Sequence, residues 1–189
     1  RGGPSSGSGT LGRSKRRTVR WHVTGSPLCN FTSVVVFAYD SRSRTCSLIR
    51  EYAPGADKML CSVAGGMFEP RRHVDAMHAA REELNEEAGL QGGTWYQLSQ
   101  RGVPKDKYSK DRLVPFLVVD GNIDPTPRPQ DPSENIKVEH GVTLQEAMRR
   151  VFDGEMPAPA AMVTLMALEK LRQLGLFSGA ADFMHLGVP

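Results

Sequence analysis

The strongest structural signal in the chain is the segment Arg81-Glu82-Glu83-Leu84-Asn85-Glu86-Glu87-Ala88-Gly89-Leu90. Glu83, Glu86 and Glu87 stand three and four residues apart, which on an α-helix places three carboxylates on one face. Like charges at these spacings destabilise an isolated helix by roughly 0.2–0.5 kcal/mol per pair. A hard divalent cation with oxygen ligands would relieve the repulsion. The alternative is a solvated acidic face, so the flanking sequence has to decide between them.

The residues around this segment predict a helix that packs closely against a sheet. Asp75 is of a type that caps helix N-termini, and Gly89 stands where a left-handed residue favours helix termination. Small apolar residues recur between them at helical spacing and permit a close approach to a neighbouring layer. These residues are Ala76, Ala79, Ala80, Leu84 and Ala88. The acidic cluster is therefore expected on a true helix, opposite a small-residue face.

Strands are predicted on both sides of this helix. Runs rich in β-branched and aromatic residues are closed by turn signals, and Pro115 in one of them indicates an edge strand or a bulge. The expected strands are 33–39, 46–52, 60–64, 95–98, 113–119 and 135–138.

The C-terminal part of the chain predicts two further helices. They are expected at residues 144–152, with Thr143 as N-cap, and at 159–174, whereas 68–74 and the four-proline segment 120–133 should be loops. This order of elements fits the α/β (α+β) class, with a mixed sheet between helices.

The charge of the chain is divided unevenly along its length. The formal net charge is +3, but residues 1–20 contain six basic residues and no acidic ones, which leaves 18 basic and 21 acidic residues in 21–189. We expect 1–20 to be a disordered basic tail, either a remnant of a plastid or mitochondrial transit peptide or a linker. Residues 21–189 should form a single domain. Because this body is mildly acidic, nucleic-acid binding by it is not expected.

Cysteine usage and hydropathy bound the setting of the protein. Cys29, Cys46 and Cys61 are odd in number and have no CxxC spacing, which indicates a reducing intracellular compartment, organellar or cytoplasmic. No apolar run approaches the roughly 20 residues that a membrane-spanning helix needs, so no membrane partner is expected.

The segment from Gly66 to Leu90 resembles the box of the Nudix hydrolase superfamily. The family pattern is G-x5-E-x7-R-E-U-x-E-E-x-G-U, in which U is a bulky aliphatic residue. Its second half matches Glu83, Glu86, Glu87 and their neighbours, and the two C-terminal helices resemble the ADP-ribose and nucleotide-sugar pyrophosphatase branch. The box diverges at Glu82, where the family has Arg, at Val74, where it has Glu, and in a loop two residues longer.

The resemblance implies a Nudix-type α/β/α sandwich with a mixed central sheet and a metal-dependent site. Mg²⁺ or Mn²⁺ would be held by Glu83, Glu86 and Glu87 together with the Gly66 carbonyl. These three glutamates would be catalytic, with Glu134 as a general base for which Asp131 and Glu139 are rivals. For each of these three residues, Glu134 included, the alternative is a solvated loop acid without a catalytic role.

The resemblance also suggests residues that contact the substrate. They are Arg50, Tyr52, Lys58, Gly66 and Arg112. Tyr52 has strand packing as an alternative role, and the Arg112 loop has a solvated one. Trp21 is either a stacking platform for a base or ribose or an N-terminal anchor of the fold. His73, His78 and His140 show no metal-ligand spacing, and we expect them at the surface.

Two functions of different kinds follow from these patterns. The first is hydrolysis of the diphosphate linkage of a nucleoside diphosphate derivative, a nucleotide sugar or an ADP-ribose-like compound. The alternative is a Nudix-fold nucleotide-binding or structural module with weakened catalysis, which the divergence at Glu82 and Val74 favours. Many relatives of this branch form dimers, so we expect a homodimer.

Overall fold

The computed structural model describes residues 20–131 and 134–178. The basic tail expected at 1–20 lies outside the described residues apart from Arg20.

An eight-stranded mixed sheet forms the middle of the molecule. Its central path is β10-β2-β1-β8-β6, with β3 paired to β2, β4 to β1 and β7 to β8. β1 and β8 run parallel, and the other strand pairs of this sheet are antiparallel. A separate pair is formed by β5 and β9. The strands are β1 Thr32–Asp40, β2 Thr45–Ala53, β3 Lys58–Ser62, β4 Ala64–Met67, β5 Leu90–Gln91, β6 Thr94–Gln97, β7 Val103–Pro104, β8 Arg112–Val119, β9 Asn122–Ile123 and β10 Lys137–Thr143.

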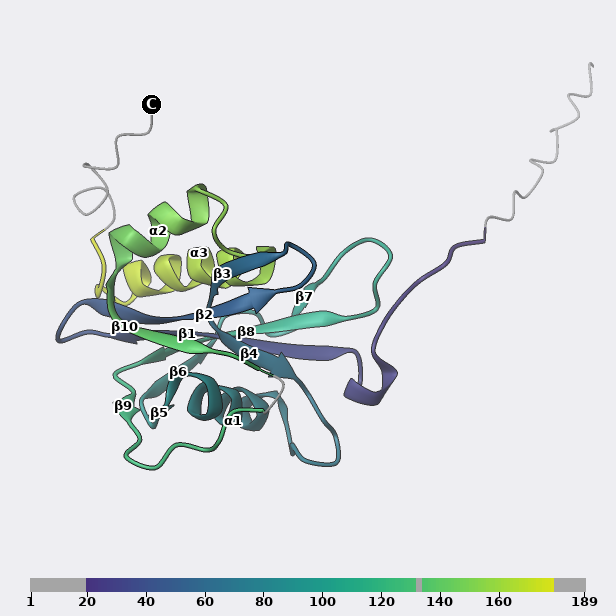
Figure 1. Ribbon diagram of the computed structural model, residues 1–189, viewed down its shortest axis with the longest axis horizontal. Coiled ribbons are helices and arrows are strands. Elements are labelled where there is room, and N and C mark those ends of the chain that lie inside the picture. The colour runs from purple at the N-terminus through teal and green to yellow at the C-terminus, as the bar shows by residue number, and fades with distance from the viewer. Residues whose placement is uncertain (1–19, 132–133, 179–189) are drawn as a thin grey trace, which may run out of the picture.

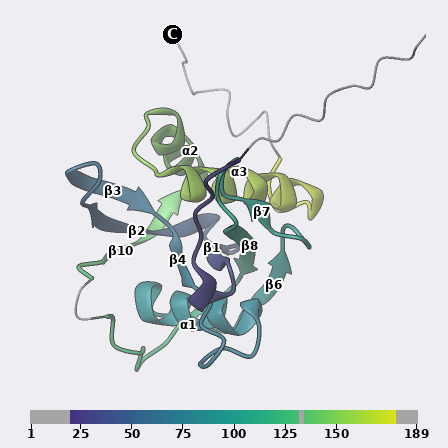
Figure 2. The same ribbon diagram turned by 90° about the vertical axis from the view of Figure 1, so that its right-hand side faces the viewer.

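Helices cover both faces of the sheet. α1 (Ala76–Ala88) packs on one face, and α2 (Leu144–Phe152) and α3 (Ala158–Gln173) pack on the other (Figures 1 and 2). The period of two along β1 separates the cores: Val34 and Val36 belong to the α1 side, Val35 and Phe37 to the other. The predicted α/β/α sandwich with a mixed central sheet is therefore confirmed.

The signals for α1 act as the sequence predicts. The Asp75 carboxylate accepts a hydrogen bond from the backbone N–H of His78 at 2.7 Å, and Gly89 closes the helix with φ 63°. Ala79 and Ala80 are completely buried between α1 and the sheet.

Among the described residues, no helix combines the length and apolar character that crossing a membrane requires.

Three strand predictions need correction. The run 60–64 is two strands, β3 and β4, because the chain changes partner at Val63 from β2 to β1. Pro115 lies inside the sheet, opposite Val35, rather than at an edge. It is tolerated because β8 changes its antiparallel partner from β6 to β7 beside it, so a missing N–H breaks no ladder there. β10 extends to residue 143 across an irregularity in its register.

We expect the Asp75→Ala substitution to destabilise the protein by roughly 0.5–2 kcal/mol, the usual cost of an N-cap. Urea unfolding followed by circular dichroism measures this change. Asp75→Asn is the matched control, because its side chain retains the acceptor and should cost little. Equal losses in both variants would show that the cap hydrogen bond is not what Asp75 contributes.

Candidate active site

The acidic face of α1 lies against two glycines of β4. Gly65 donates its backbone N–H to Glu87 Oε2 at 2.7 Å. A Cβ atom added at Gly66 would stand 2.1 Å from Glu83 Oε1. The absence of a side chain at residue 66 therefore makes the space that the Glu83 carboxylate occupies.

Burial and mutual repulsion raise the pKa values of the Glu83 and Glu87 carboxyl groups. Burial, followed by the charges of Glu86 and Glu134, raises the pKa of Glu83 to about 7. Burial raises the pKa of Glu87 to about 9 against the opposing Gly65 hydrogen bond, and the charges of Glu83 and Glu134 add to the increase. Such crowding of oxygen ligands is relieved by a bound cation.

Glu86 faces arginine rather than its acidic neighbours. Its carboxylate pairs with the Arg72 guanidinium, and Arg128 Nη1 lies 3.7 Å from Glu86 Oε1. Within the described ranges, no three acidic, histidine or cysteine side chains converge in an arrangement that could hold a metal ion. The donor chemistry of Glu83, Glu86 and Glu87 nevertheless fits Mg²⁺ or Mn²⁺, because all three offer hard oxygen atoms beside a glycine backbone.

Glu82, at the family's arginine position, is the centre of an ion-pair cluster. Arg72 Nε lies 2.8 Å from Glu82 Oε2, and Arg128 Nη1 lies 2.5 Å from Glu82 Oε1. Burial alone would raise the pKa of Glu82, but the hydrogen bond and charge of Arg128, with the charges of Arg72 and His78, hold it below its ordinary value. The charge at this position is thus the reverse of the family's: a carboxylate stands where the family has arginine, and two arginines pair with it.

The expectation that His73 lies at the surface is wrong, since the residue is only 4% exposed. The backbone N–H of Glu69 donates to His73 Nδ1 at 2.9 Å, which leaves the ring proton of a neutral imidazole on Nε2. Nε2 lies 3.2 Å from Glu82 Oε2 and donates to it. His73 therefore supports Glu82 without needing a positive charge. Sequence spacing missed this role because it depends on a turn within 69–73.

Glu134 and its rival Glu139 lie in different surroundings, and the third candidate base, Asp131, is exposed. Glu134 is largely exposed, and partial desolvation of its carboxylate, followed by the charges of Glu51 and Asp131, raises its pKa. Its charge in turn acts on both Glu83 and Glu87.

Glu139 lies on the other face of the sheet. It forms ion pairs with Arg150 of α2, at 2.5 Å, and with Arg50, at 3.7 Å. The structure thus brings Glu134, rather than Glu139, close to the α1 carboxylates. It also places Arg50, a predicted substrate contact, in the Glu139 network.

The remaining predicted substrate contacts are dispersed. Tyr52 is 47% exposed and donates its hydroxyl to Asp57 at 2.5 Å, so strand packing does not account for it. Lys58 is exposed at the start of β3. Arg112 donates to the Arg101 carbonyl at 2.8 Å and lines a cavity of about 300 Å³ near the α1 N-terminus.

Trp21, which we expected as either a stacking platform or an N-terminal anchor, is 62% exposed. Its ring centroid lies 5.8 Å from that of Tyr108.

Two residues of the site escaped the sequence analysis. Arg128 comes from a proline-rich loop without periodic signal, and it reaches Glu82 through folding of that loop around α1. Glu51 lies in β2, where the sequence pattern predicts a strand and gives no sign of a role in the site. Its negative charge nevertheless raises the pKa values of Glu87 and Glu134. A cavity of about 420 Å³ opens beside Glu82 and Arg128, with Trp95 in its wall.

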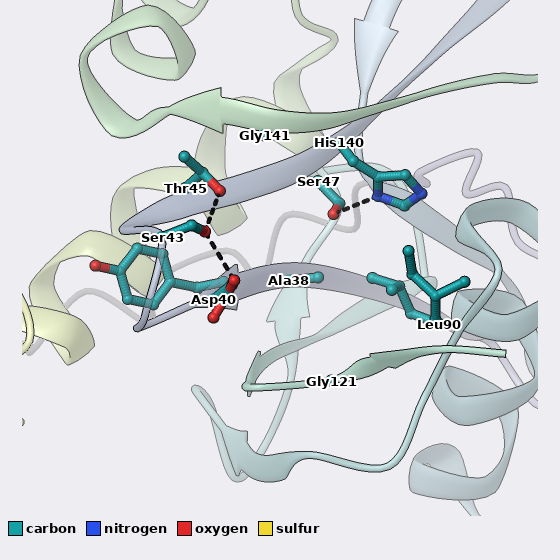
Figure 3. A pocket seen from close by; sticks show the side chains of 11 residues that line it. Ala38, Asp40, Ser43, Thr45, Ser47, Leu90, Gly121, His140 and Gly141 are labelled. Carbon is teal, nitrogen blue, oxygen red and sulfur yellow. Dashed lines mark hydrogen bonds between the residues drawn. The ribbon is translucent and has the colours of Figure 1, made fainter.

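A separate cavity of about 260 Å³, lined by both apolar and polar side chains, lies by the β1–β2 hairpin (Figure 3). In it Ser47 Oγ lies 2.8 Å from His140 Nδ1, and Ser43 Oγ donates to Asp40 Oδ2 at 2.7 Å. None of the predicted catalytic, metal-binding or substrate-binding residues is among the described residues that line it.

Comparison with known proteins identifies the family of the chain. A model of the NUDIX domain matches residues 30–165, well over half of the chain. The chain therefore belongs to the Nudix family of hydrolases, as its glutamate box predicts.

Among solved structures, the chain is similar to a crystal structure described as that of an ADP compounds hydrolase. The TM-score is 0.64 and the identity 20%, over 76% of this chain and 75% of that one, which shows a shared fold. No protein of curated function matches the sequence.

We expect Gly66→Ala to lower hydrolytic activity on the order of 10²-fold while the fold survives. The new Cβ would displace the flexible end of Glu83, and a misplacement of about 1 Å can cost this much. Steady-state kinetics and thermal unfolding measure the two effects. Gly55→Ala is the control, since nothing lies within 4 Å of its added Cβ. Unchanged kinetics in Gly66→Ala would argue against a positioned Glu83.

We also expect the metal-free protein to lose stability as pH rises from about 4.5 to about 9. The unfolded chain releases the Glu87 proton near 4.5, whereas the folded one keeps it until about 9, so the stabilisation is complete below 4.5 and is lost across this window. Each pKa unit is worth about 1.4 kcal/mol.

Urea unfolding at pH 5 and pH 9 in the presence of a chelator measures this loss. Glu87→Gln should lose at least about 1.4 kcal/mol less than the wild type over the same range. Parallel losses in the two proteins would show that Glu87 titrates normally.

Proposed function

We propose that this protein is a metal-dependent hydrolase that cleaves the diphosphate linkage of a nucleoside diphosphate derivative, a nucleotide sugar or an ADP-ribose-like compound. The observation that carries the proposal is the burial of Glu83 and Glu87 against the Gly65–Gly66 backbone, with the pKa of each carboxyl group raised. Family membership and the description of the similar structure as an ADP compounds hydrolase support it.

The glutamate side chains have different proposed roles in the reaction. Glu83, Glu86 and Glu87, with the Gly66 carbonyl, would hold Mg²⁺ or Mn²⁺. When bound, such a cation neutralises diphosphate charge and lowers the pKa of water. Glu134 would accept the proton of the attacking water. As the new O–P bond forms, the bridging P–O bond breaks, and the departing phosphate carries away the electron pair.

The raised pKa of Glu134 suits this base role. Burial and the charges of Glu51, Asp131 and Glu86 make its carboxylate a stronger proton acceptor than a free glutamate. Tyr52, Lys58 and Arg112 remain proposed substrate contacts.

The alternative, a Nudix-fold binding module with weakened catalysis, rests on the divergence at Glu82 and Val74. Val74 is 86% exposed and contributes no charge. Arg72, however, reaches Glu86 from the same loop, so a cation still contacts the acidic face. This observation favours the enzyme over the binding module.

We further propose an intracellular, reducing location and a homodimer. All three cysteines lie in the described part of the chain, and each is free, with Cys46 and Cys61 buried. Buried thiols without a disulfide are usual in reducing compartments. Light scattering with multi-angle detection tests the dimer.

We expect purified protein with Mg²⁺ or Mn²⁺ to hydrolyse at least one member of a panel of nucleotide sugars and ADP-ribose-like compounds. Glu86→Gln and Glu87→Gln should each lower kcat by at least about 100-fold, since each removes a ligand charge. Phosphate release after phosphatase coupling measures turnover. A well-folded wild type that cleaves no compound with either metal would refute the proposed function.

A further inference from the structure

Glu82 is a buried carboxylate that forms ion pairs with arginines from two separate loops. It is 8% exposed, whereas the side chains of Arg72 and Arg128 are 44% and 49% exposed. Arg72 belongs to the loop before α1, and Arg128 to the segment between β9 and β10 that runs around α1 (Figure 1). A buried carboxylate needs such partners, because an unpaired one would carry a large desolvation cost.

The charges in this cluster balance. Two carboxylates, Glu82 and Glu86, face two guanidinium groups, Arg72 and Arg128, each of which lies within 4 Å of both acids. Neutralising Glu82 would leave two guanidinium groups with the Glu86 carboxylate alone. Arg72 already pairs with Glu86, and Arg128, now 3.7 Å from Glu86 Oε1, would join it and compete with any cation for the Glu86 oxygen atoms. The charge of Glu82 therefore keeps Arg128 from pairing fully with Glu86.

The same cluster attaches the β9–β10 segment to α1. The backbone N–H of Arg128 donates to Asn85 Oδ1 at 2.9 Å, and Asn85 Nδ2 donates to Asp124 Oδ2 at 2.7 Å. The Asp124 N–H in turn donates to the Gly89 carbonyl at 2.8 Å. The stretch 124–128 of the β9–β10 segment is therefore held against α1.

We propose that Glu82 is a positioning residue of the hydrolytic site, which shares Arg72 with Glu86, holds Arg128 away from full pairing with Glu86 and ties the β9–β10 segment to α1. The inference rests on the proposed function for its catalytic consequence. Its structural part, the state of Glu86 and of the segment, does not depend on any substrate.

The test compares Glu82→Gln with Glu146→Gln, which removes one charge from the ion-pair network of α2 on the opposite face. Isothermal titration with Mn²⁺ alone should show affinity at least about tenfold weaker in Glu82→Gln than in the wild type. Hydrogen exchange at the Arg128 amide should become faster. The Glu146→Gln control should match the wild type in both measurements.

The kinetic readout separates positioning from general damage. With an active substrate, Glu82→Gln should lower kcat about 10²-fold while KM changes less than about threefold, and Glu82→Asp should recover part of kcat because it keeps the charge. Wild-type Mn²⁺ affinity, amide exchange and kcat in Glu82→Gln would overturn the inference.

If Glu82→Gln fails to fold, Arg128→Gln replaces it, since this side chain is half-exposed. Faster exchange across 124–128 with a lower kcat would support the inference, and no change in either would overturn it. Mn²⁺ affinity and exchange are read without substrate. A wild type that turns over no compound therefore counts against the proposed function, not against the role of Glu82.

Discussion

The close approach of α1 to the β4 glycines is the contact on which the rest of the site depends. A Cβ at Gly65 would lie 2.5 Å from the Val34 carbonyl oxygen, so the strand itself requires glycine there, and Gly66 leaves room for Glu83. Ala79 and Ala80 bring the helix down onto the sheet with no exposed surface. The same small residues that allow tight packing therefore place two carboxylates in a site where water is scarce, and their raised pKa values are a consequence of the packing.

α1 carries four glutamates, and the structure accommodates their repulsion in two different ways. Glu83 and Glu87 turn toward the sheet, where burial favours their neutral forms. Glu82 and Glu86 turn toward the loops, where arginines stabilise their charged forms. The helix face thus has one half in which burial favours neutral carboxyl groups and one half that is paired with arginines. In the proposed function, a divalent cation would replace the protons of Glu83 and Glu87 and would compete with Arg72 for Glu86.

The sequence predicted what depends on local signals. Asp75, Gly89 and the alanine spacing define α1 because caps and periodicity act within one helix, and the glutamate spacing led to the correct family. Long-range contacts escaped it. His73 is buried through a turn and a carboxylate nine residues away, and Arg128 reaches Glu82 across the β9–β10 segment. No pattern in a proline-rich loop records which helix it will contact. The change of partner beside Pro115 is likewise a property of the sheet and not of the strand.

The divergence at Glu82 shows that a motif position can keep its contact while its charge reverses. Coulomb attraction between helix and loop is the same whichever side carries the carboxylate. Hydrogen-bonding capacity is not, because a carboxylate accepts from several donors whereas a guanidinium only donates. An arginine at this position would gather carboxylates and add negative charge beside Glu86. Glu82 instead gathers Arg72, Arg128 and the neutral His73, and brings two half-exposed guanidinium groups to the rim of the acidic site. The reversal therefore keeps the contact between α1 and its loops while changing which of the two sides supplies the guanidinium groups.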